Sequence, residues 1–294
     1  MFLRCPVCSA ALAPGRDRIA CASCGREYNV VDSVPLLVPP ELTAQHEHQR
    51  GYFDAEFKDY GAYRVDDWRQ SFNDRIFSAI GLGSARAPYL DVGVGGSGAT
   101  VIEAARQGVE AVGCDLSVEG VLHAARFARA EGVGERAEFV VCAAEALPFP
   151  DETFECASAV AVFEHLDDDE VAARELARVL RPGGRLWVTV PHAYRLMPPF
   201  VWPAYWRHDR RIGHKRHYGA ERLRELFARH GLTHVETQFT GHPVKLVQYA
   251  ALLAGERLGK DVSRLWWRLE RADLRRVRNP FWAMQLSGVF EKPR

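Results

Sequence analysis

The chain has 294 residues, 47% hydrophobic and 26% charged, which is the composition of a globular protein with one main core and room for a small appendage. Basic and acidic residues number 38 each, so the formal net charge is zero and no overall charge attracts nucleic acid. No apolar run approaches the roughly 18 residues that span a membrane, and the start MFLRCPVC lacks the apolar centre of a secretion signal, so we expect a cytoplasmic protein.

Residues 1–40 form a short segment rich in turns and cysteine. Two C-x-x-C units, Cys5 with Cys8 and Cys21 with Cys24, are separated by twelve residues, which is zinc-ribbon spacing. A segment this small buries too little apolar surface to fold without a disulfide or a bound metal ion. We predict that the four thiolates bind a structural zinc ion with no open coordination position. Two disulfides and a redox role are the alternatives, and the expected compartment disfavours the disulfides.

Residues 41–88 have the pattern of amphipathic helices and include an aromatic-rich run at 52–68. Tyr52, Tyr60 and Tyr63 in this run are candidates for a lid over a bound ligand. Aromatic side chains that only pack a helix onto a sheet are an equally good interpretation.

From residue 89 to residue 294, short apolar runs alternate with helical patterns. The first five runs are PYLDVG, EAVGCD, AEFVVC, CASAVAVF and GRLWVTVP, and two later ones are THVETQF and AMQLSGVF. A helical insertion at 241–280, rich in Leu, Trp and Arg, separates the last two. The alternation predicts an α/β fold with a doubly wound parallel sheet.

The first run ends in the glycine-rich stretch DVGVGGSGAT. A glycine turn after a buried strand lets the backbone approach a nucleotide cofactor, and an acid about 20 residues later, here Asp115, grips the ribose. These two features fit NAD and S-adenosylmethionine equally. Asp91 favours S-adenosylmethionine, because a carboxylate beside the glycine turn repels the pyrophosphate of NAD but attracts the ammonium and sulfonium groups of S-adenosylmethionine. The alternative is that Asp91 only caps the following turn.

Four motifs in order resemble the class I S-adenosylmethionine-dependent methyltransferases: YLDVGVGGSGAT, VGCDLS, CAAEALPFPDETFECASAVAVFEHL and ELARVLRPGGRLWVTVP. The resemblance covers residues 89–191. It implies a Rossmann-like, seven-stranded methyltransferase fold, completed by strands near 234–239 and 284–291, with S-adenosylmethionine as cofactor. It also implies the cofactor contacts, which are Asp91, Gly93 and Gly95 at the methionine end, Asp115 at the ribose, Leu116 on adenine, and Ala144 and Glu145 along the adenine edge.

Two positions depart from the family pattern. Ser97 stands where the third glycine is usual, so the literal G-x-G-x-x-G formed with Gly98 is interpreted as a coincidence. Ala143 replaces the acid that commonly contacts the adenine amino group. The lost acceptor is worth about 1 kcal/mol unless backbone groups or Glu145 replace it.

Methyl transfer is an in-line displacement, and a general base is needed only when the acceptor is protonated. The candidate bases are histidines expected at the ligand edge of the sheet: His165 in VFEHL, His192 beside Tyr194 in PHAYR, and His214 and His217 in RHDRRIGHKRHYG. Helix capping by His165 and a solvated charged face at residues 207–219 are the alternatives. GHKRHY resembles a segment of methyltransferases that act on sugars, lipids and other metabolites, and its positive charge favours an anionic acceptor.

The leading interpretation is a methyltransferase acting on a small-molecule metabolite. A ribosomal or transfer RNA methyltransferase is the first alternative, since a zinc ribbon on this fold resembles ribosomal RNA guanine methyltransferases, although the neutral charge disfavours nucleic acid. A non-catalytic zinc-ribbon interaction protein is the second, and the retained cofactor residues argue against it. For the insertion, we expect packing on the domain or on a second subunit, with peripheral membrane contact as the alternative.

Overall fold

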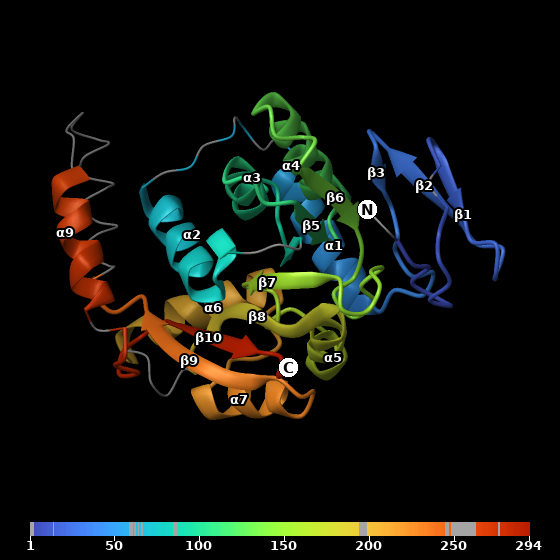
Figure 1. Cartoon of the computed structure of the whole chain (residues 1–294). Helices are drawn as coiled ribbons and strands as arrows, with labels where there is room; N and C mark the ends of the chain where they lie inside the picture. The colour runs from blue at the N-terminus through green and yellow to red at the C-terminus, as the bar shows by residue number, and fades with distance from the viewer. Residues whose placement is uncertain are drawn as a thin grey trace.

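The computed structural model describes residues 3–13, 15–58, 61, 63, 65, 67–84, 88–193, 199–244, 247, 263–275 and 277–294. Two sheets organise this part of the chain, a small one near the N-terminus at one side of the molecule and a large one at its centre (Figure 1). Tyr60, Tyr194 and residues 245, 246, 248–262 and 276 of the 241–280 insertion lie outside the described residues.

The large sheet has seven strands in the order β6-β5-β4-β7-β8-β10-β9. Its strands are β4 (Tyr89–Val92), β5 (Ala111–Asp115), β6 (Ala137–Val141), β7 (Phe154–Val160), β8 (Leu180–Pro191), β9 (Thr233–Thr240) and β10 (Gln285–Glu291). The first five strands in this order pair in parallel, and β10 is antiparallel to both of its neighbours. The predicted doubly wound, seven-stranded sheet is therefore confirmed.

Helices cover both faces of this sheet (Figure 1). One face packs against α2 (Asp67–Ile80), α3 (Ala99–Arg106) and α4 (Val118–Ala130), and the other against α5 (Asp169–Val179) and α7 (Ala220–Ala228). The described helical elements also include α1 (Ala44–Phe57), α6 (Trp202–Ile212), α9 (Ser263–Leu274), η1 (Leu82–Ser84) and η3 (Pro199–Val201). No helix among the described residues combines the length and hydropathy needed to cross a bilayer.

Side-chain caps set where several helices begin. The Ser117 hydroxyl accepts a hydrogen bond from Gly120 N at 3.0 Å at the start of α4. Asp168 accepts from Glu170 N and Val171 N, both at 3.1 Å, at the start of α5. These caps satisfy backbone donors that a helix leaves open at its N-terminus, so they help to set the first residues of α4 and α5.

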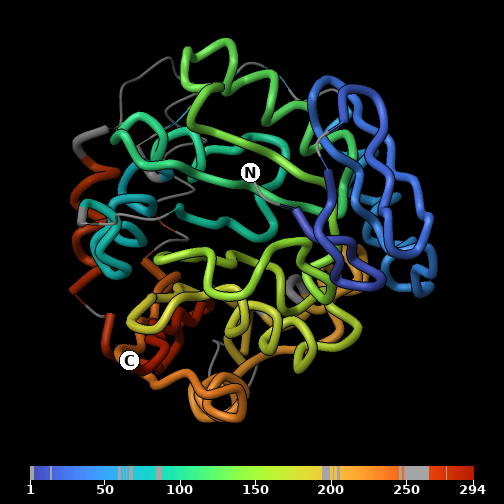
Figure 2. Tube along the Cα trace, turned by 45° about the vertical axis from the view of Figure 1, so that its right-hand side comes forward, coloured from blue at the N-terminus to red at the C-terminus, as the bar shows by residue number. Residues whose placement is uncertain are grey.

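The N-terminal module contains the small antiparallel sheet of β1 (Arg18–Ala20), β2 (Glu27–Val31) and β3 (Val34–Pro35). It lies at the opposite side of the molecule from α9 in both views (Figures 1 and 2). Leu37 N donates to Val141 O at 2.8 Å, beside a parallel bridge between Leu36 and Val141 on the edge strand β6. The apolar interior of the module is continuous with the core of the large sheet. The domain boundaries at residues 40 and 88 remain predictions.

Candidate active site

A cavity of about 560 Å³ lies at the carboxyl edge of the parallel strands. Its wall includes a residue from the end of each one: Gly93 after β4, Asp115 of β5, Cys142 after β6, Ala161 after β7 and Pro191 of β8. The chain winds outward from β4 to β6 and then returns to β7 on the other side of β4. Such a reversal leaves a crevice at the strand ends, where doubly wound folds bind ligands.

The glycine turn forms one wall of this cavity. Gly93 and Gly95 have φ values of +77° and +60°, which side chains with a Cβ rarely adopt. Gly93 N and Val94 N donate to Cys114 O at 2.8 and 3.0 Å, so the turn is fixed to β5. The positive φ values therefore explain why glycine occupies positions 93 and 95.

Gly98 is also required by the structure. It precedes α3 with φ of +59°, and a Cβ at this position would lie 2.8 Å from Ala124 Cβ on α4. The third glycine of the literal G-x-G-x-x-G is thus needed for close packing against α4. That its match to a dinucleotide fingerprint is a coincidence stays an interpretation. The shift of this role to Gly98 leaves position 97 free for serine.

Asp115 lies where the ribose-binding acid is predicted. Its carboxylate lines the cavity and accepts hydrogen bonds from Gly95 N at 3.0 Å and Ser117 N at 2.9 Å. Burial raises the pKa of Asp115, because removal from water disfavours the charged form. Leu116, Ala144 and Glu145 line the same region.

Glu145 has a partner that the sequence did not reveal. Its Oε1 lies 3.2 Å from His46 Nε2 on α1, and this interaction raises the pKa of His46. His46 also lines the cavity. Its signal is absent from the sequence because no motif links α1 to the loop after β6.

Asp91 is placed differently from the other predicted cofactor residues. It is 4% exposed, and its carboxylate accepts hydrogen bonds from the hydroxyls of Thr100 and Ser158. It is not among the residues that line the cavity. The predicted contact of Asp91 with the methionine end stays a prediction. The capping alternative is not met either, because both observed partners are side-chain hydroxyls and α3 begins without a side-chain cap.

The helix α1 covers the cavity. A Cβ at Gly96 would lie 2.8 Å from the Phe57 ring, so this ring lies directly on the glycine turn. Asp54 accepts from the Ser117 hydroxyl at 2.6 Å and from Glu119 N at 3.1 Å, which fixes the C-terminal half of α1 to the start of α4.

The N-terminal half of α1 contacts the other side of the cavity, where Gln49 Nε2 donates to Ile212 O at 3.0 Å. Among the candidate lid tyrosines, Tyr52 lines the cavity. Tyr63 instead donates to Glu103 at 2.8 Å and packs against Phe127.

The far half of the cavity is lined by Glu164, His165 and His214. Burial raises the pKa of Glu164 to about 8 and lowers the pKa of His165 to about 3. Asp209 on α6 is buried, and its two oxygens lie 2.7 Å from His214 Nδ1 and 2.7 Å from His217 Nε2. This carboxylate fixes the orientation of both imidazoles.

Two of the four candidate histidines lie away from the cavity wall. His217 is held between Asp209 and His192 O, at 2.9 Å from the latter. His192 is fully buried, with Nδ1 3.1 Å from Ala283 O and its ring against Phe239. The structure therefore brings His165 and His214 to the ligand edge and uses His192 and His217 in packing.

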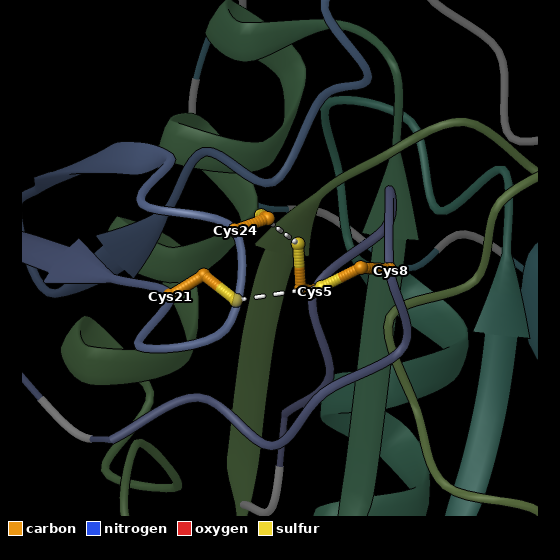
Figure 3. Close-up of side chains that lie close together, drawn as sticks. All are labelled: Cys5, Cys8, Cys21 and Cys24. Atoms are coloured by element: carbon orange, nitrogen blue, oxygen red, sulfur yellow. Dashed lines mark hydrogen bonds between the residues drawn. The ribbon is translucent and has the colours of Figure 1, made fainter.

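The four N-terminal cysteines converge (Figure 3). The Cys5 and Cys24 sulfurs are 3.7 Å apart, and those of Cys8 and Cys21 are 3.5 Å apart. All four sulfurs lie within 4.8 Å of one another. All four are free thiols, so the alternative of two disulfides is not met.

Comparison with known proteins identifies the domain. Residues 90–188 match the family model described as a methyltransferase domain. The chain carries a class I S-adenosylmethionine-dependent methyltransferase domain. The matched segment runs from β4 into β8 and so contains the glycine turn, Asp115 and the Glu164-His165 pair.

Curated relatives resemble this methyltransferase domain over part of their length. A ubiquinone/menaquinone biosynthesis C-methyltransferase from Hahella chejuensis is 53% identical over 57 residues, 19% of this chain and 23% of that protein. Norajmaline N-methyltransferase from Rauvolfia serpentina is 36% identical over 37% of each chain. The Escherichia coli tRNA 5-carboxymethoxyuridine methyltransferase is 34% identical over 42% of this chain and 47% of its own. The chain thus spans less than half the length of these relatives.

Solved structures share the fold of the methyltransferase domain. Phosphoethanolamine N-methyltransferase 2 from Haemonchus contortus, in complex with S-adenosyl-L-methionine, has a TM-score of 0.63 at 18% identity, over 88% of this chain and 62% of that one. Geranyl diphosphate C-methyltransferase from Streptomyces coelicolor has a TM-score of 0.60 at 16% identity, over 85% of this chain and 98% of that one. At these identities the likeness shows the fold.

Proposed function

We propose that this protein transfers a methyl group from S-adenosylmethionine to a small-molecule acceptor. One observation carries the proposal: the same cavity has the glycine turn and Asp115 on one side and Glu164, His165 and His214 on the other. A donor and an acceptor bound in these two halves meet inside one shared cavity, as in-line transfer requires.

The residues of the first half fit the cofactor. Asp115 offers a carboxylate to ribose hydroxyls, Leu116 an apolar contact to adenine, and Gly93 and Gly95 a backbone without side chains. When bound, S-adenosylmethionine supplies an activated methyl group on a sulfonium. The rings of Phe53 and Phe57 on α1 exclude water from this half.

The second half supports a polar or anionic acceptor. Arg211 and His208 from α6 line it together with His165 and His214. Because His214 Nδ1 faces the Asp209 carboxylate, the imidazole presents Nε2 to the cavity as a lone pair that can accept a proton. Of the four histidine candidates, His214 has the support that a general base needs, and His165 is the second candidate.

A small acceptor is favoured over RNA because residues of α1 form part of the cavity wall and because the formal net charge of the chain is zero. The tRNA methyltransferase among the relatives keeps RNA as the second candidate. The relatives whose names give plant alkaloids, and the neighbour solved with geranyl diphosphate, support metabolite acceptors.

We also propose that Cys5, Cys8, Cys21 and Cys24 bind one structural zinc ion. Zinc–sulfur bonds of about 2.3 Å in a tetrahedron place sulfurs about 3.8 Å apart. The observed 3.5 and 3.7 Å separations fit that arrangement. Four thiolates fill the coordination shell, so this ion supports folding.

Calorimetric titration with S-adenosylmethionine, followed by a screen of labelled-methyl transfer, tests the proposed function. We expect binding to the wild type and at least about tenfold weaker binding to Asp115→Ala, while the exposed Asp151→Ala variant binds as the wild type does. Labelled cofactor is then offered to a metabolite extract and, separately, to total RNA. No cofactor binding, or transfer to RNA alone, would overturn the proposal.

A further inference from the structure

Three potential metal ligands meet at the wall of the cavity. Glu164, His165 and His214 each bring one oxygen or nitrogen to within 4.8 Å of the others. Glu164 and His165 lie in the loop after β7, and His214 follows α6, so two separate parts of the chain supply the set. All three side chains line the cavity, which leaves their shared space open to a ligand.

Two of these side chains carry buried atoms without partners. Glu164 is 1% exposed and His165 is 9% exposed. Glu164 Oε2 and His165 Nδ1 have no hydrogen-bond partner within the described part of the chain. Buried polar groups are almost always satisfied, and those without a protein partner indicate a bound water or ion.

The third side chain has the support typical of a metal ligand. A histidine that binds a metal through one nitrogen nearly always donates its other N–H to a carboxylate or carbonyl. His214 Nδ1 lies 2.7 Å from Asp209 Oδ1. This contact leaves His214 Nε2 unprotonated, and Nε2 lies 3.9 Å from Glu164 Oε1.

A second cluster, of Asp209, His214 and His217, also has ligand-like spacing. Its Asp209 oxygens are both engaged by the two imidazoles at 2.7 Å, and His217 Nδ1 faces His192 O. Asp209 and His217 do not line the cavity. The second cluster is therefore a closed hydrogen-bonded array that orients His214.

We propose that Glu164, His165 and His214 bind one divalent transition-metal ion, such as zinc, iron(II), cobalt or nickel, through one carboxylate and two imidazoles. This donor set suits those ions and leaves coordination positions open toward the cavity. Zinc ligands of this type lie about 3.3 Å apart, so binding draws the 3.9 Å pair closer. The open positions accept an oxygen of the acceptor and lower the pKa of a hydroxyl there, so with the ion bound His214 Nε2 is a metal ligand in place of the proton acceptor proposed above. The inference rests on the proposed function only for this last role.

Cobalt(II) titration of the chelator-treated, reduced full-length protein tests the site. Thiolate-bound cobalt absorbs intensely in the near ultraviolet, whereas cobalt bound by nitrogen and oxygen gives only weak visible bands, so the two proposed sites are separable. We expect two equivalents in the wild type. The second equivalent binds about 100-fold or more weakly in Glu164→Gln and His165→Asn, with the thiolate signal unchanged.

His217→Asn is the matched control, since it also removes a partly buried histidine beside His214 but spares the three ligands. It should retain the second equivalent with less than about a tenfold loss of affinity. Thermal unfolding and cofactor titration verify the fold of each variant, and His214→Gln replaces any that fails. Uptake of one equivalent by the wild type, or loss in His217→Asn but not in His165→Asn, overturns the metal site. If the metal site is overturned but the protein still binds S-adenosylmethionine, the proposed methyltransferase function is unaffected.

Discussion

The Thr100 hydroxyl donates a hydrogen bond to the Asp91 carboxylate and so joins the end of β4 to the first turn of α3. The Ser158 hydroxyl on β7 donates to the other oxygen. Both carboxylate oxygens of Asp91 are therefore engaged in hydrogen bonds that stabilise the glycine turn on the side away from the cavity. Asp91 thus acts on the cavity through the shape of this turn.

The buried Asp91 carboxyl should leave a pH signature on stability. Burial raises its pKa from 3.8 to about 6, so between these values the folded chain holds a proton that the unfolded chain has released. The free energy of unfolding contributed by this group therefore falls as pH rises through that window and is constant above it. In urea unfolding from pH 4 to 6.5, the wild type should lose on the order of 3 kcal/mol relative to Asp91→Asn. Parallel curves would refute this assignment, and the exposed Asp74→Asn serves as control.

Glycine at position 98 should be irreplaceable, in contrast to another glycine with positive φ. Gly98→Ala combines left-handed strain with a Cβ 2.8 Å from Ala124 Cβ, whereas Gly108, at φ of +85°, has no atom within 4 Å of such a Cβ. We expect a loss of about 3 kcal/mol in Gly98→Ala and about 1 kcal/mol in Gly108→Ala. Chemical denaturation measures both, and equal losses would show that packing against α4 is not limiting.

The contact between α1 and α4 should matter for both stability and cofactor retention. Asp54→Ala removes two hydrogen bonds at the start of α4 and should cost about 1–2 kcal/mol. Cofactor affinity should fall severalfold, because α1 is less firmly held over the glycine turn. Glu47→Ala, which breaks only an exposed pair with Arg50 on the same helix, should change stability by about 0.5 kcal/mol or less. Unchanged cofactor affinity in Asp54→Ala would mean that α1 does not control binding.

Loss of the N-terminal metal should destabilise the whole protein. Cys5, Cys21 and Tyr28 belong to the core cluster that continues into β4, β7 and β8. Cys21→Ser should therefore lose one zinc equivalent by elemental analysis and lower the unfolding midpoint of the entire chain by roughly 5 °C or more. Cys156→Ala, in the buried strand β7, should keep its zinc. A separate early transition with an unchanged main midpoint would contradict this coupling.

The sequence predicted what depends on local pattern and missed what depends on packing. The alternation of apolar runs and helical periods predicted the strands, and the acid at the end of β5 located one wall of the cavity. The pairing of His46 with Glu145 was not predictable, because it depends on where α1 lies over the sheet. The same holds for Asp209, an acid within a charged run, whose role follows from the geometry between α6 and the loop after it.

Histidine illustrates the same limit. His165, His192, His214 and His217 are equivalent candidates in sequence, since each is expected at the ligand edge. The structure separates them by burial and by partner, and only two of them line the cavity. The sequence alone does not encode which imidazole turns inward, because that choice depends on side chains far along the chain.

The junction at Leu37 has a consequence for the solution behaviour of the protein. β6 is the outermost strand on its side of the large sheet, and the backbone beside β3 occupies part of its free edge. Open strand edges pair readily with other chains. A variant that lacks residues 1–40 would expose this strand edge together with the apolar surface under Leu37. We expect this variant to self-associate at protein concentrations at which the intact chain does not. We therefore expect the N-terminal module to reduce aggregation of the protein, independently of any catalytic role.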